Sequence, residues 1–304
     1  MKPIVGGIEA GGTKCDCVIG SGPDDIRAKI RIATTDPQTT IGELIRFITG
    51  YEKSNEHLSA LGIASFGPLD LAPASPTYGS ITSTPKPGWS NTHVFSTFRD
   101  ALRIPVAVDT DVNAAAFGEY YWGAARSLKN FLYITIGTGI GGGGMINGKL
   151  MHGLTHPEMG HVRVPQDKKA DPFEGVCSYH GNCLEGLASG PALEKRWGRK
   201  AESLEEDHPG WMLEARYLGY ALVNYICTLS PEKIILGGGV MQKRHLFPLV
   251  RSEVATLLNA YITSDMLAAH LDDYICSPAL GDKSGVSGAM ALALQEIDCL
   301  SGII

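Results

Sequence analysis

The sequence lacks a long hydrophobic run and an excess of positive charge. No stretch of its 304 residues approaches the roughly 18 consecutive apolar residues of a membrane-spanning helix. Lysine and arginine number 26 against 32 aspartate and glutamate, and the net charge of −6 argues against binding to nucleic acid or to an anionic membrane. Residues 1–7 contain no apolar segment of signal-peptide length. We therefore expect a cytoplasmic protein with no nucleic-acid partner and no membrane partner.

The sequence also lacks the cysteine pattern of a disulfide-stabilised protein. Its seven cysteines are an odd number and are scattered along a chain long enough to form an ordinary core, as expected in a reducing compartment. Five of them stand in apolar stretches and are interpreted as small core residues: Cys15, Cys17, Cys227, Cys276 and Cys299.

Glycine, in contrast, is abundant, and its 37 residues concentrate in short blocks that follow predicted strands. The blocks lie at residues 11–12, 137–144 and 237–239. Because glycine lets the backbone approach closely at unusual dihedral angles, such blocks can hold phosphate oxygens with N–H groups. A single block is more often a tight hairpin, but three together favour a nucleotide site. None has the spacing of a P-loop or of a dinucleotide-binding fingerprint, so we predict two hairpins from two domains that face each other across a cleft.

Predicted strands and helices alternate along the chain, which indicates a layered α/β fold. Asp36 and Pro37 have the residue types of a helix N-cap and of the first helical position, and an apolar stripe follows them. A strand that leads into glycines and back into a strand occurs near residues 8–19 and again near residues 131–150. The repetition indicates a duplicated structural unit.

Two carboxylates lie at strand ends beside the glycine blocks. Asp111 stands where a predicted strand ends and a helix begins, the place at which open α/β sheets bind ligands. Taken alone, it is well explained as a helix N-cap; beside phosphate loops, it is suited to accept the proton of a substrate hydroxyl during phosphoryl transfer. Glu9 precedes the first glycines and is interpreted either as a support for Mg²⁺ through water or as a strand-end charge.

Cysteine and histidine gather in a segment that is otherwise irregular. Cys177, His180 and Cys183 form a C-x₂-H-x₂-C pattern on a short loop, and all three are ligand types that zinc accepts. Buried free thiols and a surface histidine are the alternative interpretation. His161 is the candidate for a fourth ligand, and four protein ligands would make the site structural instead of hydrolytic.

Five motifs, taken in order, resemble the ROK family of sugar kinases within the actin/hexokinase-like ATPase superfamily. They are residues 9–14, 111–116, 135–142, 156–161 and 177–185. The resemblance runs from residue 4 to about 293. It is greatest to the bacterial fructokinase branch, through residues 79–89, the Thr110-Asp111 pair and the His-Pro-Glu-Met-Gly-His run.

The resemblance implies a two-domain actin/hexokinase-like (ribonuclease H-like) α/β fold with an interdomain cleft. We expect residues 1–112 and 286–304 to form a small N-terminal α/β domain. Residues 113–285 would form a larger C-terminal α/β domain, with a zinc-binding loop at residues 161–183. A homodimer is a further expectation from the family.

The resemblance also implies an activity: the transfer of phosphate from Mg-ATP to a hexose, D-fructose to D-fructose 6-phosphate, with Asp111 as general base. The sugar-binding residues would be Thr110, Asp111, Glu158, His161 and Glu185. The ATP-binding residues would be Glu9, Gly11, Gly12, Thr13, Lys14, Thr138, Gly139, Pro191, Gly237, Gly238, Gly239, Val240 and Met241. Structural Zn²⁺ would be held by His161, Cys177, His180 and Cys183.

Three positions depart from the common pattern of the family. Glu9 stands where most members have Asp, Thr110 where glucokinases of the family have Asn, and His180 where Cys is frequent. The change at Thr110 removes an amide from the predicted sugar pocket and argues against strict glucose specificity.

Three alternatives to a fructokinase stay open at the level of sequence. One is a ROK kinase for glucose, mannose or an amino-hexose. Another is a sugar-responsive repressor; repressors of the family carry a helix-turn-helix ahead of the first phosphate loop, where only eight residues precede Glu9 here. The third is a sugar- or nucleotide-binding protein without turnover.

Overall fold

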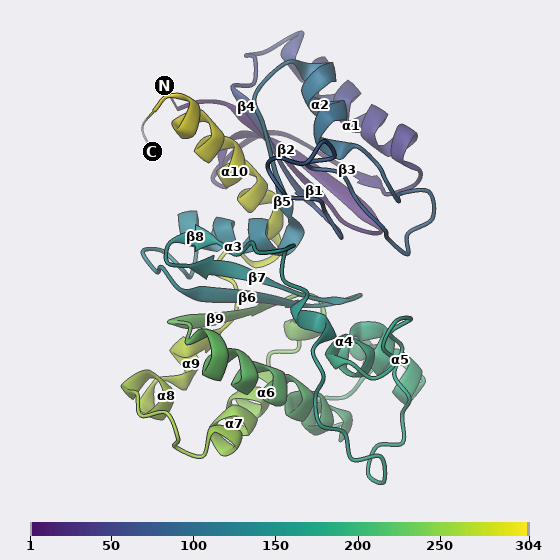
Figure 1. Cartoon of the computed structure of the whole chain (residues 1–304), viewed down its shortest axis with the longest axis vertical. Helices are drawn as coiled ribbons and strands as arrows, with labels where there is room; N and C mark the ends of the chain where they lie inside the picture. The colour runs from purple at the N-terminus through teal and green to yellow at the C-terminus, as the bar shows by residue number, and fades with distance from the viewer. Residues whose placement is uncertain (1, 303–304) are drawn as a thin grey trace. The chain divides into compact units, whose positions relative to one another are not determined.

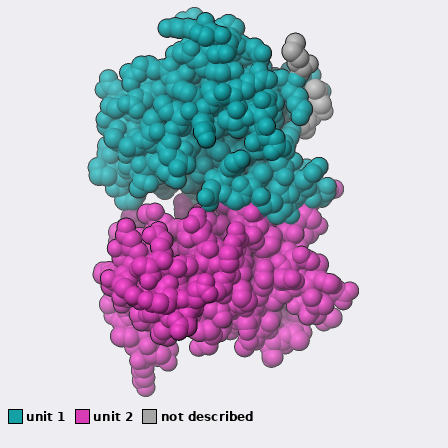
Figure 2. Space-filling model, turned by 180° about the vertical axis from the view of Figure 1, so that it is seen from behind, with its two compact units in different colours: residues 1–127, 150–157, 279–304 teal, residues 128–149, 158–278 magenta. Residues whose placement is uncertain are grey.

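A computed structural model describes residues 2–302; residues 1 and 303–304, which the predicted N-terminal domain includes, lie outside the described residues. The chain forms two compact units, coloured separately in Figure 2. Unit 1 contains the residues up to 127, residues 150–157 and the residues from 279 onward, and unit 2 contains residues 128–149 and 158–278. Among residues 2–302, no helix has the length and apolar character needed to cross a membrane.

Unit 1 contains a five-stranded sheet in the order β3-β2-β1-β4-β5 (Figure 1). Strand β1 pairs antiparallel with β2 and parallel with β4, and β5 pairs parallel with β4. The elements of this unit are β1 (Val5–Ala10), β2 (Lys14–Gly22), β3 (Asp25–Ala33), α1 (Pro37–Glu52), β4 (Ala60–Ser65), α2 (Val94–Leu102), β5 (Val106–Thr110), α3 (Asp111–Trp122) and α10 (Ser284–Leu300).

The two faces of this sheet are covered by different helices. Side chains of successive strand residues point to opposite faces. Ile8 of β1 belongs to the hydrophobic cluster that includes Leu44 of α1 and Phe98 of α2. Val5, three positions earlier and therefore on the other face, packs with Met290 of α10. Odd-numbered positions of β1 thus face α10, and Glu9 is one of them.

The predicted start of the first helix is confirmed. Pro37 is the first residue of α1, and Asp36 Oδ1 accepts a hydrogen bond from the backbone N–H of Thr39 at 2.9 Å. This contact satisfies one of the N–H groups that a helix leaves without an intrahelical partner.

The prediction that five cysteines are core residues is only partly correct. No disulfide joins any of the seven cysteines, and Cys15 and Cys17 are buried, but Cys227 and Cys299 are exposed and Cys276 is half-buried. The prediction was wrong for Cys227 and Cys299 because an apolar neighbourhood in sequence does not place a residue on the buried face of a helix.

Unit 2 repeats the topology of unit 1, with the sheet order β10-β9-β6-β7-β8. Strand β6 pairs antiparallel with β7 and parallel with β9, as β1 pairs with β2 and β4, so the expected duplication is confirmed. The elements are β6 (Phe131–Ile136), β7 (Ile140–Ile146), β8 (Lys149–Leu150), α4 (Leu184–Ala188), α5 (Gly190–Trp197), α6 (Gly210–Leu229), β9 (Lys233–Gly237), α7 (Leu246–Leu258), α8 (Asp265–Ala269), α9 (Leu271–Tyr274) and β10 (Ile275–Cys276), with short 3₁₀ turns at Met159–His161, Ala201–Ser203 and Val240–Gln242.

The compact units differ from the domain bounds expected from sequence in three places, because residues 113–127, 150–157 and 279–285 belong to unit 1 and not to the second domain. The expected boundary at residue 112 falls inside α3, which groups with unit 1 in full. The physical reason is close packing of α3 on α10, since a Cβ at Gly118 would stand 2.6 Å from the carbonyl oxygen of Ser284. Glycine at position 118 therefore lets the two helix backbones approach.

Candidate active site

The first glycine block forms the turn between β1 and β2 in unit 1. The backbone N–H of Gly11 donates to the carbonyl of Lys14 at 3.0 Å, which closes the turn. Thr34 braces it from outside, because its hydroxyl donates to the Gly11 carbonyl at 2.7 Å and its N–H donates to the Thr13 carbonyl at 3.0 Å. A Cβ at Gly12 would meet no atom within 4 Å, so this side of the turn is open. Thr34 was missed by sequence analysis because it lies far from the turn along the chain.

Glu9 lies at the end of β1, beside the first turn of α10. The pKa of its carboxyl group is raised to about 7, first by burial and then by the negative charges of Asp111 and Asp16, although Lys14 and a backbone hydrogen bond from Val286 act to lower it. Repulsion between Glu9 and Asp111 shows that two carboxylates share this region of unit 1. A hydrated divalent cation would relieve such repulsion, since Mg²⁺ prefers oxygen ligands.

Asp111 begins α3 directly after β5. The helix N-cap is Thr110, whose hydroxyl oxygen accepts a hydrogen bond from the N–H of Asn113 at 3.1 Å. The alternative interpretation of Asp111 as the N-cap is therefore wrong. Asp111 Oδ1 accepts from the N–H of Val112 at 2.9 Å, which holds the carboxylate at the positive end of the helix.

Three polar residues behind Asp111 were not singled out from sequence. Asp109 and Asn113 are buried and joined by a 2.9 Å hydrogen bond. His152, 43 positions from Asp109 along the chain, contacts the same carboxyl group at 2.8 Å. Asp109 and Asn113 are four positions apart, and only the folded chain brings His152 to them.

In unit 2 the second glycine block forms the turn between β6 and β7. Gly137 N–H donates to the Gly139 carbonyl at 2.9 Å. Glu185 of α4 accepts a hydrogen bond from the N–H of Ile140 at 2.9 Å, and a Cβ at Gly139 would stand 2.7 Å from the same carboxylate oxygen. Glycine at 139 thus allows Glu185 to approach the loop that carries Thr138.

The third glycine block lies close to the second. Gly190 N–H, at the start of α5, donates to the Gly137 carbonyl at 2.7 Å, so Pro191 is placed beside the Thr138 loop. A Cβ at Gly137 would stand 3.8 Å from the nitrogen of Gly239. Unit 2 therefore brings together all of the residues that were expected on the adenosine side. The side chains of Val240 and Met241 are buried, so only their backbone groups are available to a ligand on this side.

Four predicted metal ligands lie together in unit 2. Nδ1 of His161 is 3.7 Å from Sγ of Cys177 and 3.5 Å from Sγ of Cys183, and Nδ1 of His180 is 3.7 Å from Sγ of Cys177. The four ligand atoms all lie within 4.8 Å of one another. Tetrahedral zinc with usual bond lengths would separate a sulfur from a nitrogen ligand by about 3.6 Å. The donor set and its spacing therefore fit a zinc ion.

The two ring nitrogens of His161 face different groups, one the cysteine thiols and the other a carboxylate. While Nδ1 faces the two cysteines, Nε2 is 3.9 Å from Oε2 of Glu158, a residue expected to bind sugar. Burial raises the pKa of the Cys183 thiol to about 11, so a cation is needed for this group to be a thiolate at neutral pH.

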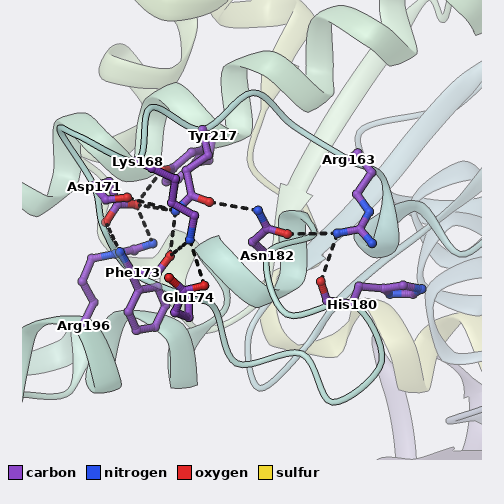
Figure 3. A network of polar contacts seen from close by, with 10 residues as sticks. Arg163, Lys168, Asp171, Phe173, Glu174, His180, Asn182, Arg196 and Tyr217 are labelled. Atoms are coloured by element: carbon purple, nitrogen blue, oxygen red, sulfur yellow. Dashed lines mark hydrogen bonds and ion pairs between the residues drawn. The ribbon is translucent and has the colours of Figure 1, made fainter.

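The loop that carries the cysteines is held by a polar network of its own (Figure 3). Arg163 donates to the carbonyl of His180 and to Oδ1 of Asn182, both at 3.0 Å. At the other end of the network, Asp171 pairs with Arg196 at 3.3 Å, and both side chains are 6% exposed. These contacts hold the backbone of the loop beside the metal-ligand cluster.

Comparison with known proteins identifies the family. The ROK family matches residues 5–296. The chain belongs to the ROK family. It is 43% identical over 302 residues to a fructokinase of Zymomonas mobilis, covering 96% of this chain and 97% of that protein. It is also 43% identical over 287 residues to a fructokinase of Lactococcus lactis, with coverage of 94% and 95%.

A solved ROK structure agrees with the fold. The ROK glucokinase of Streptomyces griseus, in complex with glucose and AMPPNP, is similar with a TM-score of 0.76 and 25% identity, over 96% of this chain and 99% of that one. The expected α/β fold of the actin/hexokinase-like superfamily is thereby confirmed.

The predicted site residues of this ROK chain form one group in each unit. Unit 1 contains Glu9, Gly11, Gly12, Thr13, Lys14, Thr110 and Asp111. Unit 2 contains Thr138, Gly139, Glu158, His161, Cys177, His180, Cys183, Glu185, Pro191, Gly237, Gly238, Gly239, Val240 and Met241.

Proposed function

We propose that this protein is an ATP-dependent hexose kinase that converts D-fructose to D-fructose 6-phosphate. The observation that carries the proposal is the near-complete alignment with fructokinases at 43% identity. Within the site, Thr110 also supports fructose over glucose as the substrate. It stands where glucokinases of the family have Asn, its hydroxyl oxygen caps the helix, and its side chain has no amide to bind a sugar.

Asp111 is the general base in this proposal. Its carboxylate takes the proton of the sugar 6-hydroxyl while the oxygen forms a bond to the γ-phosphorus of ATP. The bond between that phosphorus and the β,γ-bridging oxygen breaks, and ADP leaves with the electron pair. The position of Asp111 at the end of β5 and the start of α3 supports this role, since it is fixed by secondary structure.

The glycine turns are the phosphate-binding part of the site. Gly11, Gly12 and Thr13 in unit 1 and Thr138 with Gly139 in unit 2 would donate backbone N–H groups to the phosphates. Pro191, the Gly237–Gly239 block, Val240 and Met241 would bind the adenosine. Glu9 would hold Mg²⁺ through water, and Lys14 would add positive charge near the phosphates; the bound cation neutralises charge on the transferred group.

Glu158, His161 and Glu185 would bind the hydroxyls of the sugar. Zinc held by His161, Cys177, His180 and Cys183 would be structural, since all four positions are protein ligands. The 3.9 Å contact between His161 and Glu158 supports a link between this metal site and the sugar site. Bound zinc would hold the His161 ring in a single orientation.

A kinase for glucose, mannose or an amino-hexose is the second candidate, because the similar Streptomyces griseus structure is a glucokinase with bound glucose. A coupled assay of ADP release separates the two. Purified protein is tested with ATP and each hexose, with and without Mg²⁺. We expect the highest kcat/KM with fructose and no turnover without Mg²⁺. A higher kcat/KM with another hexose would overturn the fructokinase assignment, and ATP and hexose binding without turnover would indicate a binding protein.

The predicted homodimer and cytoplasmic location belong to the same proposal. Seven cysteines with no disulfide among them fit a reducing compartment. The mass of the purified protein in solution, measured by light scattering, tests the dimer.

A further inference from the structure

The turn from β5 into α3, residues 109–113, is held by three hydrogen bonds around one buried carboxyl group. Asp109 Oδ1 accepts from the N–H of Thr110 at 2.7 Å and from Nδ2 of Asn113 at 2.9 Å. Asp109 Oδ2 contacts Nε2 of His152 at 2.8 Å. The carboxyl group of Asp109 is 4% exposed, so these protein partners replace water around it.

The tautomer of His152 follows from these contacts. A carboxylate only accepts hydrogen bonds, so Nε2 of His152 must donate to Asp109. Nε2 therefore cannot also accept from Asn113 Nδ2, which lies 3.4 Å away. The two amide hydrogens of Asn113 go instead to Asp109 and to the carbonyl of Met151, at 3.2 Å.

Met151 and His152, which lie outside the turn, thus stabilise it through hydrogen bonds. They contact Asp109 on the strand side and Asn113 on the helix side, and Asp111 lies between the two in the chain. The hydrogen bond to Asp109 raises the pKa of His152, which favours a charged imidazolium beside the buried carboxylate. Its side chain is 42% exposed, so His152 lies at the edge of the core and is not part of it.

We propose that His152 is a positioning residue for the reaction: through Asp109, which in turn accepts from Asn113, it fixes the orientation of the helix turn that presents Asp111. The inference rests on the proposed role of Asp111 as general base. A small displacement of a catalytic group lowers the rate of the chemical step, and a misplacement of about 1 Å can cost about 100-fold. The other proposed sugar ligands, Glu158, His161 and Glu185, lie outside this turn, so the loss should appear mainly in kcat.

The test compares His152→Ala with His152→Gln by steady-state kinetics at saturating Mg²⁺. We expect alanine to lower kcat about 10- to 100-fold while the KM values for fructose and ATP stay within about twofold. Glutamine retains an N–H donor that can reach Asp109, and we expect it to recover most of the loss. His152→Ser, whose hydroxyl is too short to reach Asp109, replaces alanine if the latter does not fold.

Leu154→Ala is the matched control. Leu154 lies two residues from His152 in the same segment, and its side chain is fully exposed, so its truncation should leave kcat, KM and melting temperature unchanged. A kcat for His152→Ala within twofold of the wild type would overturn the proposal. So would a raised fructose KM at unchanged kcat, or a glutamine variant no better than alanine.

Asp111→Asn, measured beside these variants, separates this inference from the proposed function. Near-normal turnover by Asp111→Asn would remove the base assignment, and the positioning role with it. A large loss in Asp111→Asn together with normal turnover in His152→Ala would leave the base in place and overturn the positioning role alone.

Discussion

The carboxyl group of Glu9 packs against Gly285 in the first turn of α10, so closely that a Cβ at position 285 would overlap it. Glycine at position 285 lets the end of β1, which carries Glu9, approach the N-terminus of α10. The N–H of Val286 partly compensates the charge of Glu9, but burial and the nearby Asp111 and Asp16 still favour the protonated form. A partly protonated carboxyl group of this kind is suited to bind Mg²⁺ only while the nucleotide is also bound.

The raised pKa of Glu9 predicts a dependence of stability on pH. Its pKa is about 7 in the folded protein against an ordinary value of 4.5, so the folded state holds this proton more tightly than the unfolded state. Protonated Glu9 therefore favours folding at low pH, and the contribution is lost as the pH rises from about 4.5 to about 7. At about 1.4 kcal/mol per pKa unit, the free energy of unfolding should fall by roughly 3 kcal/mol over this range.

Urea unfolding at several pH values, without divalent cations, tests this dependence against Glu9→Gln. The glutamine variant has no proton to lose at this position, so it should lack the fall between pH 4.5 and pH 7. Its advantage in stability over the wild type should be greatest above pH 7. Parallel curves for the two proteins would contradict the assignment of the shift to Glu9.

Asp111→Asn should lower kcat by about 100- to 10,000-fold, the usual contribution of a general base. The change keeps the size of the side chain and an oxygen that can accept from the N–H of Val112, so the fold should be retained. Fructose affinity, measured by calorimetry, should change much less than kcat. Retention of near-normal turnover would exclude Asp111 as the base.

Gly12→Ala should weaken ATP binding without weakening the fold. A Cβ at Gly12 meets no atom within 4 Å, so the substitution causes no clash within the protein. The methyl group would instead occupy space that a phosphate needs near the turn, and we expect the KM for ATP to rise about tenfold or more, a loss of about 1.4 kcal/mol. The melting temperature should stay close to that of the wild type.

Gly42→Ala is the control for Gly12→Ala. Gly42 lies inside α1, where an added Cβ also meets no atom within 4 Å. Alanine is a better helix former, so this variant should be more stable by about 0.5–1 kcal/mol, with unchanged kinetics. Equal effects of the two substitutions on the KM for ATP would argue against a phosphate site at Gly12.

Removal of a metal ligand should lower zinc content, stability and sugar affinity together. In Cys177→Ala or Cys183→Ala, elemental analysis should find less than one zinc per chain, and the free energy of unfolding should fall by about 3 kcal/mol or more. The KM for fructose should rise because His161 is no longer held beside Glu158. Cys227→Ala, which changes an exposed thiol, should alter none of the three. Wild-type protein purified without chelator and free of zinc would contradict the metal site.

Local signals in the sequence predicted the parts of the site that depend on neighbours along the chain. The start of α1 follows from Asp36 and Pro37, since capping is a contact between residues three positions apart. Three of the four ligands in the Cys and His cluster stand within seven residues. The glycine turns and the repeated strand–turn–strand unit were equally accessible, because each follows from a strand and the turn after it.

Contacts between segments far apart in the chain could not be predicted from local sequence signals. Thr34 on the Gly11 turn, Glu185 on the N–H of Ile140 and His152 on Asp109 each join residues far apart in sequence. The exposure of Cys227 likewise depends on which face of α6 meets the core.

By itself the sequence determined the alternation of strands and helices, the glycine turns, the capped start of α1 and the ligand types for a metal, because these depend on backbone preferences and short spacings. Only the tertiary structure decided which polar side chains support them. Burial removes water from Asp109 and Glu9, and the partners that replace it come from whichever distant segment the fold packs against them.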